Sequence, residues 1–163
     1  ARTGNTLPID VDEGEARELR ERIWDTPADV FVAAAASGLL NEAALDRIEK
    51  SGVDTIVSAA NHPFWAARPG DARLEREADS RFAVVADVIA GCGTAHAFAC
   101  QSSANRILSP EDVLGSIEDT VTEAVREAAS RVTSTERGLL AGALEVALER
   151  CEGQPGAGQP VLT

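Results

Sequence analysis

The chain has 163 residues, of which 44% are hydrophobic, enough for one domain with a packed core. Its formal net charge of −12 excludes nucleic acid and anionic membrane as expected partners, because both bind cationic surfaces. No apolar run approaches the ~20 residues needed to span a bilayer, and no signal peptide is recognisable. Three cysteines without a CxxC pair predict free thiols, a cytoplasmic location and no bound metal.

The first half of the chain predicts helices that alternate with strands. Residues 14–24 carry apolar side chains at helical spacing and predict a surface helix. Asn41 is the expected N-cap of a second helix that ends at Lys50, and residues 74–79 predict a short third helix. Apolar runs predict three strands, at residues 29–36, 53–60 and 81–86. The first two runs lack alternation, which indicates strands covered on both faces, and the spacing predicts an α/β fold with a parallel sheet.

The second half predicts helices only. Residues 91–100 are small and predict the start of a close-packed helix. The sequence from Ser109 to Asp112 is typical of a helix start, and residues 133–136 match a capping box before a last helix. We expect residues 1–152 to form one partial dinucleotide-binding domain with C-terminal helices. Residues 153–163 are rich in Gly and Pro and predict a disordered tail.

Three strand ends are the places where chemistry is expected. Ligands of open α/β sheets bind outside the carboxyl ends of the strands, and these ends carry Ala34–Ala36, Asn61 and the segment 87–94. Small side chains leave room for a ligand ring, and an amide offers both a donor and an acceptor. Asn is also common before a turn, and alanines can simply pack tightly. The sequence contains no GxGxxG after a strand and no P-loop.

Five blocks of sequence carry a resemblance to a known family. They are DVFVAAAASGLLNEAALDRI, VDTIVSAANHP, VVADVIAGCGTAHAF, IEDTVTEAVREA and ALEVALERC, and they lie between Asp29 and Cys151. In this order and spacing they resemble the C-terminal half of the glutamate/leucine/phenylalanine/valine dehydrogenases. The resemblance implies a Rossmann-like cofactor domain without its first strand, glycine turn and second strand. It also implies that no catalytic residue lies in this chain, because in the family a preceding domain carries the catalytic Lys and Asp.

The family resemblance implies a reaction and a set of site residues. Family enzymes oxidise an L-amino acid to a 2-oxo acid and reduce NAD or NADP. By carry-over, Ala34, Ala35 and Ala36 would line the cofactor, and Asn61 would contact its nicotinamide half. Gly91 and Phe98 would border the amino acid substrate.

The chain departs from the family pattern at four positions in these blocks. Gly91 stands where the family has Asn, Ser58 where it has Glu, and His62 where it has Gly. Phe98 occupies the position that helps to recognise a glutamate side chain, which argues against glutamate as substrate.

Two further expectations concern the state of the chain. The absence of Met, including at position 1, fits either the C-terminal part of a longer protein or a product whose start was removed. A sheet without its first strands exposes an apolar edge, so we expect an isolated chain that is inactive and poorly soluble or oligomeric. Its partner would be a second copy or the missing N-terminal half. The alternative function is a non-catalytic Rossmann-like binding or assembly module.

Overall fold

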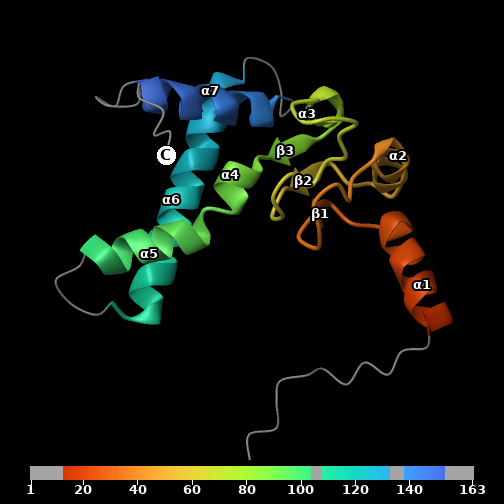
Figure 1. The fold of residues 1–163 in the computed structure, drawn as a ribbon, viewed down its shortest axis with the longest axis horizontal. Helices are drawn as coiled ribbons and strands as arrows, with labels where there is room; N and C mark the ends of the chain where they lie inside the picture. Colours follow the sequence, from red (N-terminus) through yellow and green to blue (C-terminus); the bar gives the residue numbers. More distant parts are fainter. Residues whose placement is uncertain (1–12, 104–107, 133–137, 153–163) are drawn as a thin grey trace, which may run out of the picture.

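The computed structural model describes residues 13–103, 108–132 and 138–152 (Figure 1). The expectations for residues 1–12, for the capping box at 133–136 and for the tail from 153 onward lie outside the described residues. The helices are α1 (Glu13–Arg22), the short 3-10 helix η1 (Ile23–Asp25), α2 (Glu42–Lys50), α3 (Arg73–Arg81), α4 (Asp87–Ala90), α5 (Gly93–Ser103), α6 (Pro110–Arg131) and α7 (Leu139–Glu152). The strands are β1 (Val30–Val32), β2 (Thr55–Val57) and β3 (Ala83–Val85).

The three strands form one parallel sheet in the order β1-β2-β3, with α2 and α3 as the crossover helices. Phe31, Ile56 and Val84 stand side by side in the register. This arrangement confirms the predicted α/β class and is consistent with part of a Rossmann-like fold. The strands are shorter than predicted because the backbone turns just beyond them, where Ala34 N donates to Val32 O and Ala59 N to Val57 O.

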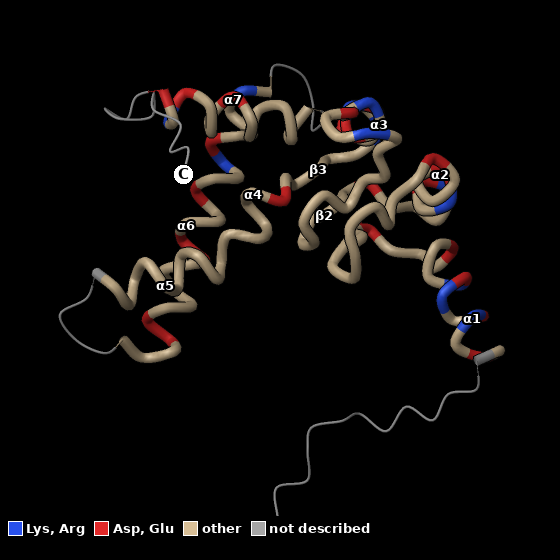
Figure 2. The backbone as a smooth tube through the Cα atoms, viewed as in Figure 1, with Lys and Arg blue, Asp and Glu red and all other residues tan. Residues whose placement is uncertain are grey.

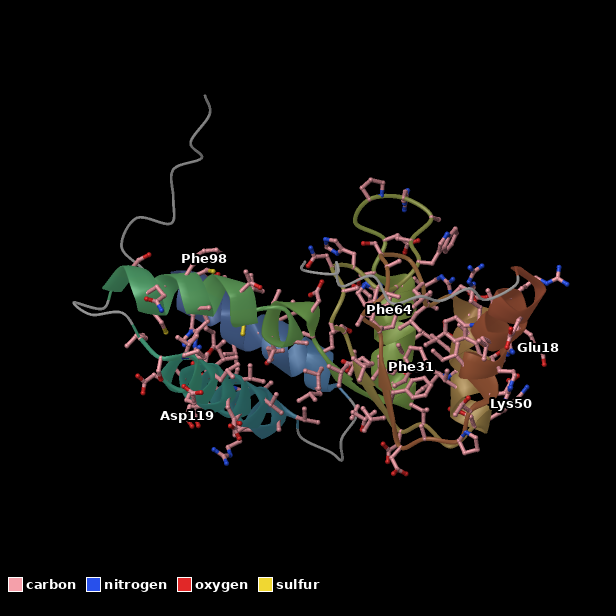
Figure 3. The ribbon with its side chains drawn as sticks, turned by 90° about the horizontal axis from the view of Figure 1, so that it is seen from below. Glu18, Phe31, Lys50, Phe64, Phe98 and Asp119 are labelled. Atoms are coloured by element: carbon pink, nitrogen blue, oxygen red, sulfur yellow. The ribbon has the colours of Figure 1, made fainter. Side chains whose placement is uncertain are left out.

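The two faces of the sheet differ in how far they are covered. On one face Phe31, Ile56 and Val84 are buried, and Trp24 of η1 stacks on Phe31 with ring centroids 5.6 Å apart. Figure 3 shows Phe31 and Phe64 in the sheet region, between α1 and α2 on one side and the C-terminal helices on the other. On the other face Val30 is 48% exposed and Val32 is 56% exposed. The prediction that the first strand is covered on both faces is therefore wrong, because α7 packs against β3 and leaves β1 open in the part of the chain that the structure describes.

Local sequence signals fix the ends of two helices as predicted. The Asn41 side chain accepts a hydrogen bond from Ala44 N at 2.9 Å and caps α2. At the start of α6, the Ser109 hydroxyl accepts from Asp112 N at 3.1 Å, and the Asp112 carboxylate accepts from Ser109 N at 3.3 Å. This reciprocal pair is a complete capping box.

Helix α5 is open rather than closely packed. None of its described side chains is buried, and Phe98 is 70% exposed. The small residues do allow α5 to approach α6, but α5 carries no large apolar side chain that other described elements cover. The prediction of a close-packed helix is therefore wrong.

A buried carboxylate joins the helical half to the sheet half. Asp79 of α3 accepts hydrogen bonds from Leu140 N at 2.9 Å and from Ala141 N at 3.0 Å, so it caps α7 from a distant part of the sequence. Farther along α7, Gly142 lies against α6 so closely that an added Cβ atom would come within 2.5 Å of the Ala128 carbonyl oxygen. These two contacts fix the position of α7 on both neighbours. No described helix has both the length and the apolar character that a membrane crossing requires.

Candidate functional site

Hydrogen bonds join the segments that follow the three strands. The Ser37 hydroxyl donates to Asn61 O at 2.6 Å, and Gly38 N donates to His62 O at 2.9 Å. His62 N in turn donates to the Asp87 carboxylate at 3.1 Å. The carboxyl ends of β1, β2 and β3 are thus held together mainly through backbone groups. We call this surface, made of residues 34–38, 59–62 and Asp87, the strand-end face.

The predicted cofactor residues all lie on the strand-end face. Ala34, Ala35 and Ala36 are exposed directly after β1, and Asn61 is exposed after β2. Among the described residues, no hydrogen bond holds the Asn61 side-chain amide, although its backbone carbonyl accepts from Ser37. The structure therefore brings these four residues to one edge and leaves the amide available to a ligand. Their contact with a cofactor stays a prediction.

His62 adopts a backbone conformation that glycine would adopt more readily. Its φ is 48°, in the left-handed region, where a Cβ atom is unfavourable. The backbone N–H and the carbonyl of His62 are both hydrogen-bonded, to Asp87 and from Gly38, which holds the residue in this conformation. The geometry gives a physical reason why glycine suits this position in the family that the sequence resembles.

Gly91 ends α4 at a point with no space for a side chain. Its N–H donates to Asp87 O at 2.7 Å, and an added Cβ atom would lie 2.9 Å from the same oxygen. Real Cβ atoms almost never come so close to a backbone oxygen, so an Asn at this position would require α4 to shift. The local backbone therefore has no room for the Asn that the family pattern has at this position.

Phe98 lies in a different place from the strand-end residues. It lines a groove of about 600 Å³ between α5 and α6, together with Ala97, Val113, Leu114 and Ile117. Leu114 is 65% exposed, and α5 carries no charged residue (Figure 2). Figure 3 shows Phe98 on the helical part of the molecule, well away from Phe64 beside the sheet. The structure does not bring Phe98 to Asn61, and its role at a substrate stays a prediction.

A small cavity that the sequence does not predict lies beside the strand-end face. Its volume is about 200 Å³, and it is lined by Ser58, Glu75, Asp87, Val88, Leu140 and Leu144, among others. Ser58 is only 1% exposed, and its hydroxyl has no hydrogen-bond partner among the residues that the structure describes. Burial is the main cause that raises the pKa of Glu75, and the nearby Asp87 raises it further, whereas His62 and Arg76 lower it. The only feature of the sequence that points to this cavity is Ser58, which departs from the family pattern. We call this space the Ser58 cavity.

A cluster of polar side chains links α5 to α6. The His96 ring Nε2 lies 2.8 Å from the Ser116 hydroxyl and 3.5 Å from the Thr120 hydroxyl, and the Cys100 sulfur lies 3.7 Å from the same serine oxygen. His96 and Cys100 therefore face the same way, as residues four apart on a helix do. Among the described side chains, no group of three or more His, Cys, Asp or Glu residues could hold a metal ion. All three cysteines, including Cys92 and Cys151, are free.

Comparison with known proteins agrees with the resemblance seen in the sequence. Residues 5–154 match the sequence profile described as Glutamate/Leucine/Phenylalanine/Valine dehydrogenase. The chain belongs to this family. The match spans the sheet, the strand-end face and the C-terminal helices. A search among curated proteins found no significant match.

Proposed function

We propose that this chain forms the C-terminal part of the cofactor domain of an amino acid dehydrogenase. The reaction is the oxidation of an L-amino acid to a 2-oxo acid, with NAD or NADP as the hydride acceptor. Family membership supports a dehydrogenase-type function. The observation that carries the finer proposal is the strand-end face, where Ala34–Ala36 and the unpaired Asn61 amide gather at the carboxyl edge of a parallel sheet.

The strand-end face fits the nicotinamide half of the cofactor. The exposed methyl groups of Ala34, Ala35 and Ala36 leave room for a flat ring beside the backbone, and the Asn61 amide offers a donor and an acceptor to its carboxamide or ribose. A bound nicotinamide would supply the acceptor for the hydride from the α-carbon of the amino acid. The residues of this chain would hold the ring in place and exclude water from one side of it.

The family resemblance would place the substrate next to Gly91 and Phe98, although the structure does not bring Phe98 to Asn61 on the strand-end face. Because Gly91 has no side chain, it cannot supply the hydrogen bond that an Asn would give near the reacting centre. Phe98 is apolar and favours an amino acid with an apolar side chain over glutamate. The catalytic Lys and Asp would come from another part of the enzyme, since the only lysine of this chain, Lys50, lies exposed at the end of α2.

The partner would pack against β1. Val30 and Val32 expose two neighbouring apolar side chains on the outermost strand of the sheet, which is a surface that proteins usually cover. Either the N-terminal half of the enzyme or a second copy of this chain would cover it. Without that partner the chain has no glycine-rich turn for the pyrophosphate, so its own affinity for the cofactor should be weak.

Ligand-observed NMR with NADH and NADPH tests this function on the full chain. We expect saturable binding in the millimolar range, and a loss of about tenfold in Asn61→Ala, because a hydrogen bond of this kind contributes about 1 kcal/mol or more. Gln101→Ala, which removes an exposed amide from α5, is the matched control and should bind like the parent chain. Equal binding by Asn61→Ala and the parent, or no saturable binding, would contradict the assignment.

One observation favours a second candidate, a Rossmann-like binding module without catalysis. Gly91 has no room for a side chain, so the Asn side chain of the family pattern is absent from the substrate region. This candidate predicts nicotinamide binding at the strand-end face, but no amino-acid-dependent reduction of NAD or NADP once the N-terminal half is supplied. Turnover under those conditions would exclude it.

A further inference from the structure

We propose that the α5–α6 groove is a docking site for a basic amphipathic helix of a partner protein. The volume of the groove is about 600 Å³, and two large apolar side chains in its walls are exposed, Phe98 at 70% and Leu114 at 65%. The residues that line the groove differ from those of the strand-end face. The proposal therefore goes beyond the proposed function and needs no cofactor.

The walls of the groove have the spacing that a third helix would match. The four positions that each helix contributes are Thr94, Ala97, Phe98 and Gln101 from α5 and Pro110, Val113, Leu114 and Ile117 from α6. In both walls these positions follow the pattern i, i+3, i+4, i+7, so each wall is one stripe along its helix. A helix with apolar residues at the same spacing can pack between two such stripes.

Polar contacts hold α5 beside α6 without using the exposed apolar side chains. The His96 ring Nε2 lies 2.8 Å from the Ser116 hydroxyl oxygen, and the Cys100 sulfur lies 3.7 Å from the same oxygen. None of these three side chains lines the groove. The side chains of Phe98 and Leu114 are therefore free to contact a partner.

The charges beside the groove favour a basic partner. Residues 93–103 and 110–122, which include both walls, contain four acidic residues and no Lys or Arg, and Figure 2 shows acidic residues on α6 and none on α5. Glu111 lies three positions before Leu114 and Glu118 lies four positions after it, so both share its face of the helix. Both are exposed, and within the described residues neither forms an ion pair or a side-chain hydrogen bond. Lys or Arg residues beside the apolar stripe of a partner helix would complement these carboxylates.

The same carboxylates disfavour other occupants of the groove. A second copy of the chain carries a net charge of −12 and would place its own acidic residues opposite Glu111 and Glu118. An anionic lipid would meet the same repulsion. The spacing of the walls and their charge thus agree on a basic amphipathic helix.

A designed peptide tests the proposal on the full chain. The peptide has about 15 residues, with Leu at positions i, i+3, i+4 and i+7 and Lys on both sides of this stripe. Heteronuclear NMR should show saturable shifts of the amide signals of Ala97, Val113 and Ile117 during the titration. A peptide of the same composition in scrambled order, without an apolar stripe, should bind at least about tenfold more weakly. A peptide with Glu in place of every Lys should also bind at least about tenfold more weakly.

Two variants test the apolar contact. Leu114→Ser removes an anchor from the groove and should weaken the Leu/Lys peptide about fivefold or more. Leu148→Ser removes a leucine of similar exposure, 62%, from α7 and should bind the peptide like the parent chain. Because both leucines are exposed, both variants should stay folded, which unchanged amide spectra away from the substitutions would show.

Two pairs of substitutions test the role of charge. Glu111→Gln combined with Glu118→Gln should lower both the affinity for the Leu/Lys peptide and its dependence on salt. Glu145→Gln combined with Glu152→Gln makes the same change in net charge at exposed positions on α7 and should leave the affinity nearly unchanged.

Four outcomes would overturn the proposal. They are no saturable shift, equal binding of the scrambled peptide, unchanged affinity in Leu114→Ser, and equal losses in the two pairs of charge substitutions. Self-association of the chain that Leu114→Ser abolishes would assign the groove to a second copy and would also overturn it. None of these outcomes bears on NADH binding at the strand-end face, which the Asn61→Ala experiment measures separately.

Discussion

The sheet half of the molecule, from α1 to β3, and the helical half, from α4 to α7, are held together in different ways. In the sheet half, large side chains such as Phe31, Leu45 and Ile56 are buried between the strands and the helices that connect them. In the helical half, α6 has 22 residues but buries only Ala128 among its described side chains, and α5 buries none. The sheet half thus contributes most of the large buried side chains, and the same core continues into the helical half through Ile89, Ala128, Leu140 and Ala143.

This difference also separates two kinds of candidate site. On the strand-end face, hydrogen bonds that each involve a backbone group of Asn61 or His62 determine the geometry. In the α5–α6 groove, exposed side chains such as Phe98 and Leu114 determine it. We infer that the strand-end face is preformed, and that the groove can change more readily when a partner or substrate covers it.

The largest expected effect comes from removing the contact that joins the two halves. Asp79→Ala deletes both hydrogen bonds to the start of α7 and leaves the buried Leu140 N–H unpaired, so we expect a loss of about 2–4 kcal/mol in the free energy of unfolding. Hydrogen exchange should lose more protection in α7 than in β1–β3. Asp119→Ala, an exposed position on α6, is the control and should change stability by less than about 0.5 kcal/mol. An equal loss of protection in both halves would show that they unfold as one unit.

Two glycines in the helical half should respond in opposite directions to alanine. At Gly142 a Cβ atom would meet the backbone of Ala128, so Gly142→Ala should cost about 1–3 kcal/mol in urea unfolding. Gly115, in the interior of α6, has nothing within 4 Å of an added Cβ, so Gly115→Ala should stabilise the chain by about 0.5–1 kcal/mol. If both variants were stabilised, the close approach of α6 and α7 would not determine the stability of the helical half.

A smaller effect is expected at His62 on the strand-end face. His62→Gly should raise the free energy of unfolding by about 1 kcal/mol, because glycine adopts a φ of 48° without the steric cost of a Cβ atom. His62→Asn should lie between the two, since Asn tolerates the left-handed region better than most residues. Urea unfolding of the three chains measures the order. A loss of stability in the glycine variant would show that the His62 side chain contributes more than its backbone strain costs.

The smallest effect is a change in pH dependence at the Ser58 cavity. Burial raises the pKa of Glu75 above its ordinary value of 4.5, so between 4.5 and the raised pKa the folded chain binds more protons than the unfolded chain. This residue therefore lowers stability as the pH rises through that window. Glu75→Gln removes the effect, so its gain over the parent should be greater at about pH 7 than at about pH 4. A gain that is the same at both pH values would contradict the raised pKa, and Glu118→Gln controls for the change in net charge.

The sequence predicted features that depend on neighbouring residues better than features that depend on distant ones. The Asn41 cap and the Ser109–Asp112 capping box were predicted because a few adjacent residues determine each of them. The three strands were predicted from apolar runs, but the runs could not show that none of the described helices covers Val30 and Val32. For the same reason the small residues of α5 did not predict an exposed Phe98.

Site features that depend on tertiary contacts could not be predicted. The Asp79 cap joins residues that are 61 and 62 positions apart, and no local pattern encodes such a contact. The Ser58 cavity requires side chains from the segment after β2 and from α3, α4 and α7 to meet, so the sequence pattern around Glu75 predicted only a charged residue on a surface helix. The strand-end face was predicted because the topology of a parallel sheet brings the carboxyl ends of its strands together.

The most direct test of the account compares the two halves of the cofactor on the full chain. Heteronuclear NMR would follow the amide signals of Ala34, Ala35, Ala36 and Asn61 during titration with reduced nicotinamide mononucleotide and, separately, with adenosine monophosphate. We predict saturable shifts at the strand-end face with the nicotinamide half, and no shifts there with the adenosine half. Shifts with the adenosine half alone, or nicotinamide-dependent shifts confined to other surfaces, would contradict the proposal that this face holds the nicotinamide.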